Sequence, residues 1–219
     1  MLSDSVTIRF MCHRLNQKVN LRVVADLFEA TDRSSATETV NDLFPLTDML
    51  VVRQDQDGDR ELVDCNWGLL PFWWKPSAKH KSHKSFQRMT FNARGETIHE
   101  KPSYREAFKS KRCLIPWTEF FEHGWYFKVR ESDVSAFAGL WQSWSDAESG
   151  ETLETCTIVT CQANELVEQY HPKKRMPVIL NDEDSRRRWL DSDVVERPAI
   201  DDLIVPFPAG QMQHWEAGT

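Results

Sequence analysis

The chain has 219 residues, a formal net charge of −7 and 40% hydrophobic residues, with nine tryptophans and twelve phenylalanines. This is enough apolar material for the core of one large domain or two small ones. No apolar run approaches the ~20 residues of a membrane helix, and the first residues lack the basic and apolar regions of a signal peptide. The negative charge also argues against a protein that coats nucleic acid by bulk charge.

The five cysteines are odd in number and widely spaced: Cys12, Cys65, Cys113, Cys156 and Cys161. No CxxC pair occurs, so neither a zinc site nor a disulfide framework is indicated. We therefore expect a reduced, cytoplasmic protein without a metal or cofactor. His80 and His83 have ligand-like spacing, but no third ligand is evident, and a basic loop is the preferred interpretation.

Along the chain, residues 20–30 predict a helix with Asn20 as its cap and Leu21, Val24 and Phe28 on its apolar face. Residues 49–53 and 61–66 flank an Asp-Gly turn and predict a hairpin. Residues 75–90 are expected to form a flexible basic loop. Residues 102–110 begin with proline and predict a helix.

The middle of the chain is rich in predicted strands, which cover residues 112–116, 118–123, 125–130, 136–144 and 153–161. Their regular spacing predicts a meander that curls into a barrel-like sheet. Short helices are expected over 163–170, 184–191 and 198–203, and a frayed tail over 210–219. The predicted fold is a single α+β domain with a curled antiparallel sheet and short flanking helices. The predicted boundaries are 1–11 as a leader or misassigned start, 12–205 as the domain and 206–219 as a tail.

A basic and aromatic interval extends from residue 65 to 95, where no acidic residue occurs. Its cations are interleaved with aromatic side chains: Lys75, Lys79, Lys81, Lys84, Arg88 and Arg94 with Trp67, Phe72, Trp73, Trp74, Phe86 and Phe91. Such a mixture suits single-stranded nucleic acid, where phosphates need charge and bases need flat faces. A solvated basic loop beside a tryptophan-rich core explains the same composition, and both interpretations stay open at this point.

The start of the chain offers a distinctive nucleophile at Cys12, which directly follows Met11. If processing exposes Cys12, its α-amine (pKa near ~8) and thiol (near ~8.5) sit on neighbouring atoms. Together they capture an aldehyde as a five-membered thiazolidine. An internal cysteine lacks the amine, and the alternative is an ordinary cysteine in an early strand.

Further segments combine polar residues with apolar neighbours in a fixed order: Trp67-Gly68-Leu69-Leu70-Pro71, Asn92-Ala93-Arg94, Phe120-Phe121-Glu122 and His171 followed by Arg175-Met176-Pro177. With Met11-Cys12, this order resembles the SOS response-associated peptidase (SRAP) family over roughly residues 11–190. Members of that family recognise abasic sites in single-stranded DNA and trap them covalently through an N-terminal cysteine. They are also described as peptidases that remove their own leader.

The resemblance implies a catalytic set of Cys12, Asn92, Glu122 and His171. Cys12 is the expected nucleophile. His171, with an ordinary pKa near ~6.5, is expected to move protons during sugar ring opening. Glu122 follows the apolar residues Phe120 and Phe121, where desolvation favours a proton-donating carboxyl. Asn92 is expected to hold the α-amine or a sugar oxygen without titrating.

The resemblance also implies a DNA-binding surface and an enzymatic activity. The expected phosphate contacts are Arg14, Arg94, Arg112 and Arg175, and Trp67 with its neighbouring aromatics is expected to stack on bases. The expected partner is single-stranded DNA containing abasic sites, bound by a monomer. The expected activity is abasic-site processing by cross-linking or lyase chemistry, with autoproteolytic cysteine peptidase activity.

The chain departs from the family pattern at several positions. His13 follows the cysteine where the family has glycine, and His123 follows the glutamate where it has an aromatic residue. Gly95 replaces a serine after Asn-Ala-Arg, and Glu119 replaces a small glycine before the two aromatics. Between His171 and Arg175 stand three residues, Pro172-Lys173-Lys174, instead of one.

Three of the candidate catalytic residues also have an ordinary structural interpretation. Asn92 as a turn cap, Glu122 as the partner of a buried arginine and His171 as a surface histidine each fit their local sequence. At the level of function, the alternatives are a cysteine N-terminal-nucleophile peptidase acting on proteins and a non-catalytic module that binds single-stranded DNA.

Overall fold

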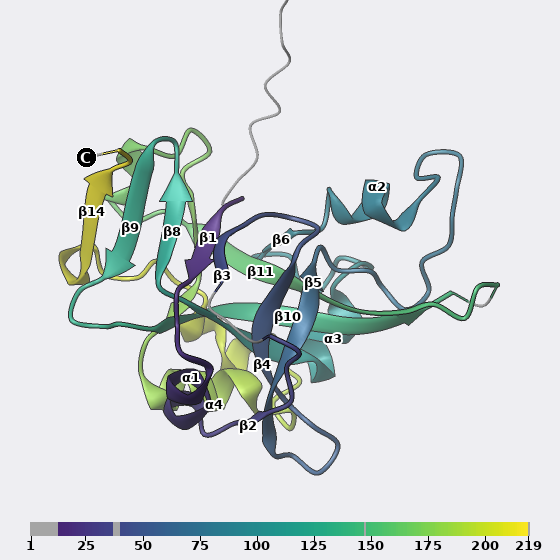
Figure 1. Ribbon diagram of the computed structural model, residues 1–219. Helices are drawn as coiled ribbons and strands as arrows, with labels where there is room; N and C mark the ends of the chain where they lie inside the picture. The colour runs from purple at the N-terminus through teal and green to yellow at the C-terminus, as the bar shows by residue number, and fades with distance from the viewer. Residues whose placement is uncertain (1–12, 37–39, 147, 219) are drawn as a thin grey trace, which may run out of the picture.

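The computed structural model describes residues 13–36, 40–146 and 148–218, and within them the chain folds into two sheets flanked by short helices (Figure 1). The expected α+β fold is confirmed. Cys12, the expected nucleophile, lies outside the described residues.

The larger sheet runs in the order β12-β11-β10-β7-β4-β5-β2. Its strands are β2 (Thr31–Asp32), β4 (Asp48–Gln54), β5 (Arg60–Trp67), β7 (Arg112–Trp117), β10 (Ser135–Ser145), β11 (Thr152–Gln162) and β12 (Arg175–Pro177). Because β5 also pairs in parallel with β11, placing Trp67 opposite Cys156, the strands β11, β10, β7, β4 and β5 close into a ring. The barrel-like core is therefore confirmed, with two short additions: β6 (Asn92–Arg94) beside β11 and β13 (Ile179–Leu180) beside β10.

The smaller sheet has the order β14-β9-β8-β1-β3. It consists of β1 (Leu15–Gln17), β3 (Val40–Leu43), β8 (Glu119–Glu122), β9 (Trp125–Val129) and β14 (Met212–Glu216). The expectation of a frayed tail over residues 210–219 is wrong, because β14 pairs along the whole of β9 and buries Met212. The neighbouring β8 connects the two sheets, since it follows β7 directly.

Four α-helices occur in the described residues: α1 (Leu21–Phe28), α2 (His83–Gln87), α3 (Arg105–Ser110) and α4 (Glu183–Leu190). Asn20 caps α1 as expected, accepting a hydrogen bond from the backbone N–H of Arg22. The expected loop over 75–90 contains α2. The helix expected over 163–170 is reduced to the 3-10 turn η1 (Val167–Gln169).

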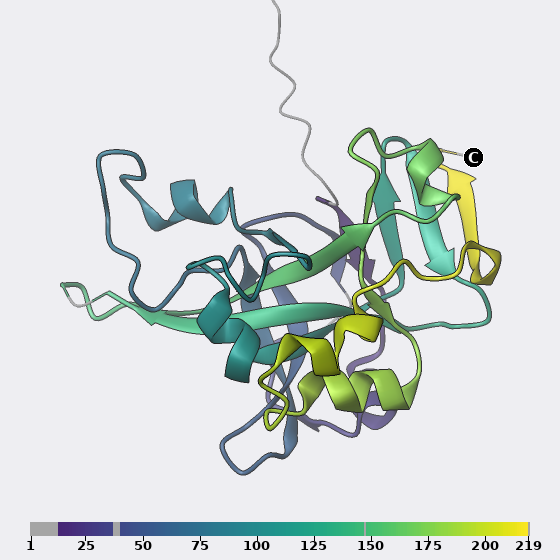
Figure 2. The ribbon, with the colours of Figure 1, turned by 180° about the vertical axis from the view of Figure 1, so that it is seen from behind.

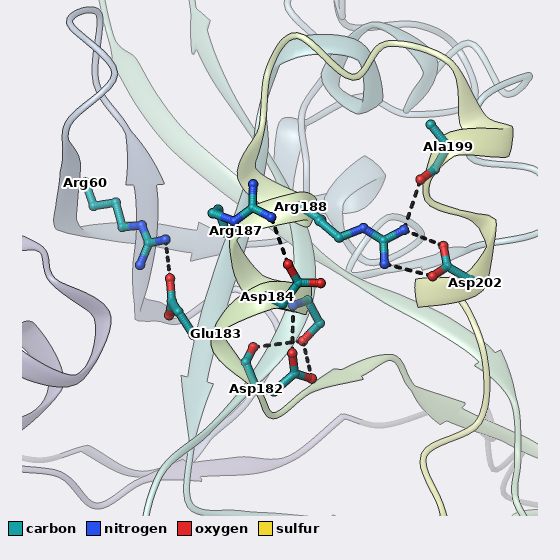
Figure 3. Close-up of polar contacts among 9 residues, drawn as sticks. Arg60, Asp182, Glu183, Asp184, Arg187, Arg188, Ala199 and Asp202 are labelled. Atoms are coloured by element: carbon teal, nitrogen blue, oxygen red, sulfur yellow. Dashed lines mark hydrogen bonds and ion pairs between the residues drawn. The ribbon is translucent and has the colours of Figure 1, made fainter.

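Ion pairs and a cap hold α4 in place (Figure 3). The Asp182 side chain accepts from the backbone N–H of Ser185, which caps the helix start. Glu183 pairs with Arg60 of β5 at 2.6 Å, and Arg188 pairs with Asp202 at 2.7 Å. Asp202 belongs to the 3-10 turn η3 (Asp201–Leu203), which follows η2 (Arg197–Ala199).

The core fills the ring of strands with large side chains. All six residues of β7 are buried, and the rings of Trp117 and Phe137 stack with centroids 4.4 Å apart. Helices α1, α3 and α4 lie on one side of the long strands β10 and β11, whereas α2 lies on the other (Figures 1 and 2). None of the helices in the described ranges is long and apolar enough to span a membrane.

Candidate functional site

The most unusual feature of the molecule is a buried carboxylate surrounded by imidazoles. Glu122 ends β8 and its side chain is 1% exposed, although nothing in a strand core requires an acid. The Nε2 atom of His171, itself 3% exposed, lies 3.7 Å from Glu122 Oε1. His123, in the left-handed turn after β8, places its Nε2 3.4 Å from the same oxygen. A buried acid beside titratable rings marks a candidate active site.

The local structure fixes the protonation of His171. Its Nδ1 accepts a hydrogen bond of 3.0 Å from the backbone N–H of Lys173. In the neutral ring the proton therefore resides on Nε2, the atom that faces Glu122. Burial, with repulsion from His123, lowers the pKa of His171 to about 4. At neutral pH His171 is thus an uncharged donor, which differs from the expected side chain of ordinary pKa.

The beginning of the described chain runs directly along this carboxylate. In β1, Leu15 pairs with Phe120 and Asn16 with Glu119 of β8, and the N–H of Phe121 donates to the carbonyl of Arg14. This register brings the preceding residue, His13, towards Glu122. Burial, followed by repulsion from His123 and Arg14, lowers the pKa of His13. The buried Nδ1 of His13 has no hydrogen-bond partner in the described part of the chain.

A cavity of about 220 Å³ opens at His13 and is lined also by Phe44, Pro45, Arg88 and Phe91. Phe91 directly precedes Asn92, the first residue of β6. The parallel pairing of β6 with β11 places Asn92 opposite Ile158, and the Asn92 carbonyl accepts from the Tyr104 hydroxyl at 3.3 Å. The structure thus joins Glu122 and His171 directly, and brings the neighbours of Cys12 and Asn92 together at one cavity.

Two of the arginines expected at DNA are instead built into the core. Arg112 is 4% exposed and donates to the carbonyls of Phe108, Trp189 and Asp191. Arg175 is 4% exposed and pairs with Glu96 while donating to the Thr160 carbonyl. In this structure both guanidinium groups bind protein acceptors, and their expected contacts with phosphates stay a prediction.

The other two expected arginines are more accessible. Arg94, in β6, is exposed. Arg14 is 26% exposed on its side chain, pairs with Asp42 at 2.7 Å and lies 4.8 Å above the ring of Phe121. Both face solvent near the cavity-lining segments, although Arg14 already has an acidic partner.

Trp67, expected to stack on bases, is completely buried. Its indole N–H donates to the Phe91 carbonyl at 2.7 Å, and its ring packs edge-on against Phe91. In this structure Trp67 positions the segment before Asn92, and its expected stacking on bases stays a prediction. Other apolar side chains of the same interval are exposed: Phe72 (59%), Trp73 (45%) and Met89 (58%).

Sequence reasoning missed Arg88 as part of the cavity and His123 as a neighbour of the carboxylate. Only the position of His123 beside Glu122 in the sequence signalled its role. His80 and His83 pack against the rings of Phe86 and Trp144, with centroids 5.4 and 5.8 Å apart. Across the described ranges no group of three or more His, Cys, Asp or Glu side chains is arranged to hold a metal ion.

Known proteins match this chain over most of its length. A family model described as SOS response associated peptidase (SRAP) matches residues 11–219. The abasic site processing protein YoqW of Bacillus subtilis is 36% identical over 186 residues, covering 80% of this chain and 77% of the relative. The abasic site processing protein HMCES of Gallus gallus is 31% identical, covering 68% of this chain and 51% of that protein.

A solved crystal structure has a similar fold. The crystal structure of a Bacteroides thetaiotaomicron protein superimposes with a TM-score of 0.84 at 27% identity, covering 94% of this chain and 91% of the other. Both the sequence and the fold are therefore shared over nearly the whole length. The chain belongs to the SOS response-associated peptidase (SRAP) family.

Proposed function

We propose that this protein processes abasic sites in single-stranded DNA by capturing the sugar aldehyde covalently at Cys12. The observation that carries the proposal is the buried Glu122–His171 pair, approached by His13, the residue that follows Cys12. Membership of the family, and relatives named abasic site processing proteins, give the substrate class.

The nucleophile requires cleavage of the bond between Met11 and Cys12. Hydrolysis adds one water, leaving a carboxylate on Met11 and an α-amine on Cys12. The amine and the thiol then stand on neighbouring carbons, Cα and Cβ, so that one aldehyde carbon closes a five-membered ring. With pKa values near ~8 and ~8.5, a fraction of each is unprotonated at neutral pH.

Ring opening of the abasic sugar is the first step assigned to Glu122 and His171. The C1 hydroxyl loses a proton while the ring oxygen gains one, which generates the aldehyde. Glu122 can carry that proton between the two oxygens, and His171 holds its Nε2–H towards Oε1. Because His171 is neutral, it places no positive charge near the α-amine.

Condensation then forms the cross-link. The amine nitrogen attacks the aldehyde carbon, and the carbonyl oxygen leaves as water after receiving a proton from Glu122. The sulfur adds to the imine carbon, and the thiol proton passes to the nitrogen. The product is a thiazolidine, one water is released, and no oxidation occurs. Asn92 supports this step by holding the amine or a sugar oxygen.

We choose the proposed DNA-contacting residues by the exposure of their side chains. Arg94 and Arg14 are proposed to bind phosphates beside the lesion, and Arg88 is added because it lines the cavity. Phe72 and Trp73 are proposed to stack on bases, since they are exposed where Trp67 is not.

The decisive experiment is mass spectrometry of the intact protein before and after incubation with an abasic oligonucleotide. We expect the wild type to begin at Cys12 and to gain the mass of the oligonucleotide less one water. Cys12→Ser keeps the amine and is expected to give only a reducible imine. A heat-stable adduct with Cys12→Ala, or with residues 1–11 still attached, would contradict the proposal.

Self-processing is a linked proposal, supported by the peptidase name of the family. If Cys12 assists cleavage of its own peptide bond, Cys12→Ala will retain residues 1–11 while the wild type loses them. Equal removal from both proteins would assign the cleavage to another enzyme and leave the capture chemistry intact.

A further inference from the structure

The segment between Trp74 and Met89 is a charged surface of which the proposed function uses only the last residue, Arg88. We call residues 75–88 the basic arm; it contains α2 and the exposed cations Lys75, Lys79, Lys81, Lys84 and Arg88. Within residues 13–36, 40–146 and 148–218, none of these five forms an ion pair, whereas Arg53, Arg60 and Arg188 elsewhere do. Five cations without acidic partners are a surface for an anionic ligand.

The basic arm is held in place by aromatic packing at its base. Trp74 packs against Trp144 and Phe86, with ring centroids 5.7 and 5.9 Å apart. The Trp144 indole N–H donates to the Trp74 carbonyl at 3.0 Å. Gln87 donates to the Gly68 carbonyl at 2.8 Å and to the Asn66 side chain at 2.9 Å. The cations are therefore presented on a folded support, which lowers the entropy lost on binding.

The basic arm is continuous with the proposed site. Arg88, its last residue, lines the cavity with His13 and Phe91. Exposed Phe72 and Trp73 precede the arm, and exposed Met89 follows it. A strand that leaves the cavity along Arg88 thus meets positive charges and apolar faces together, the combination that binds unpaired nucleotides.

We propose that the basic arm binds the phosphates of the DNA strand on one side of the lesion, so that the bound segment extends several nucleotides beyond the cavity in one direction. The ligand is the single strand whose abasic site occupies the cavity. This inference rests on the proposed function for the identity of the strand, but it does not depend on the covalent step.

The test uses a variant that removes charge from the arm and spares the cavity: K75Q, K79Q, K81Q and K84Q combined. The matched control removes four exposed cations from α1, α3 and α4, on the far side of β10 and β11: R22Q, R105Q, K109Q and R187Q. Lysine-to-arginine changes at the four arm positions keep the charge and should keep the affinity.

Binding of an undamaged 20-nucleotide single strand is measured between 50 and 200 mM salt. Each phosphate contact contributes about −0.7 to the log–log salt slope for single strands, so the arm variant should have a slope shallower by about 2.8. Its affinity at the lowest salt should fall at least tenfold, while the control variant stays within twofold of the wild type. A slope and affinity equal to those of the control would overturn the proposal.

Direction is tested by cross-linking to 20-nucleotide strands with the abasic site near one end or the other. The arm variant should lose efficiency with only one of the two; equal loss with both would overturn one-sided binding. Equal or greater loss of affinity for a 20-base-pair duplex would overturn the single-strand assignment. If the wild type forms no adduct but the salt slopes differ as expected, the proposed chemistry fails and the arm assignment stands.

Discussion

Glu122 is placed where a carboxylate is costly, which makes it a candidate for proton transfer. Its side chain is 1% exposed, and two imidazole nitrogens lie within 3.7 Å of one oxygen. Burying a charge without a polar partner is unfavourable. The two imidazole rings therefore lower the free-energy cost of burying this carboxylate. The two rings are not equivalent: His171 is buried, whereas His123 is 37% exposed.

The first prediction removes the titrating function of Glu122 while keeping its shape. Glu122→Gln should lower the rate of adduct formation at saturating abasic DNA by about 10²- to 10⁴-fold, the usual contribution of a general acid–base. Affinity for undamaged single strands should stay within twofold. Glu119→Gln, on the same strand but contacting Asn16 and Lys18, is the control and should keep the wild-type rate. A similar loss in both variants would point to damage to β8 rather than lost proton transfer.

The second prediction follows from the pKa of His171, about 4 in the folded protein against about 6.5 when unfolded. Between these values the unfolded chain binds more protons, so this contribution is complete above pH 6.5 and is lost as the pH falls towards 4. The loss is on the order of 3 kcal/mol. Urea unfolding of wild type and His171→Gln over pH 4–7 should show a flatter dependence for the variant. Parallel curves would show that His171 is not shifted in this way.

The residues of the site divide into those that sequence could identify and those that it could not. Glu122 and His171 stand in short motifs whose chemistry is local, and the structure brings them together. The protein contacts of Arg112 and Arg175 were not predictable, because their acceptors lie 77 and 79 residues away at Trp189 and Glu96. An arginine next to a motif looks the same in sequence whether it faces a phosphate or a buried carbonyl.

At the scale of elements, most strands were recognisable because β-branched and aromatic residues alternate between turns. β14 was missed because it is short, and its stability comes from pairing with β9, far away in the chain. The arm was predicted as a loop because its few helical residues carry no apolar stripe. Its conformation depends on packing against Trp144 and Gly68, which local sequence does not reveal.

The third prediction concerns Gly68, the residue that lets the arm approach β5. Its φ is +140°, and an added Cβ would lie 2.7 Å from Gln87 Cβ and 3.0 Å from the Gln87 carbonyl oxygen. Gly68→Ala should therefore displace α2 and cost about 1–3 kcal/mol in urea unfolding. Tryptic cleavage at the arm lysines should become faster, and affinity for single-stranded DNA should fall.

Gly58→Ala is the matched control for that change. Gly58 also has a positive φ of +88°, but an added Cβ meets nothing within 4 Å. Its cost should be limited to backbone strain, with arm cleavage and DNA affinity unchanged. Equal effects of both substitutions would mean that contact with Gln87 does not position the arm.

At the scale of the whole molecule, the separation of charge matters more than its sum. The net charge is −7, yet the interval from residue 65 to 95 holds cations and no acid. An acidic body disfavours non-specific wrapping of nucleic acid, while one basic edge still attracts it locally. The groups proposed to transfer protons, Glu122 and His171, are in contrast buried, where screening ions have little effect.

This separation predicts that salt affects binding and chemistry differently. Raising salt from 50 to 200 mM should increase the abasic-DNA concentration that gives half-maximal cross-linking by more than about tenfold, as expected for several phosphate contacts. The rate at saturating DNA should change less than twofold, because Glu122 and His171 are 1% and 3% exposed and salt screens buried groups weakly. Single-turnover kinetics over a range of DNA concentrations at each salt separate the two quantities. A saturated rate that falls in parallel with affinity would instead place a screened, solvent-exposed charge in the reacting site, and the assignment of proton transfer to the buried pair would have to be abandoned.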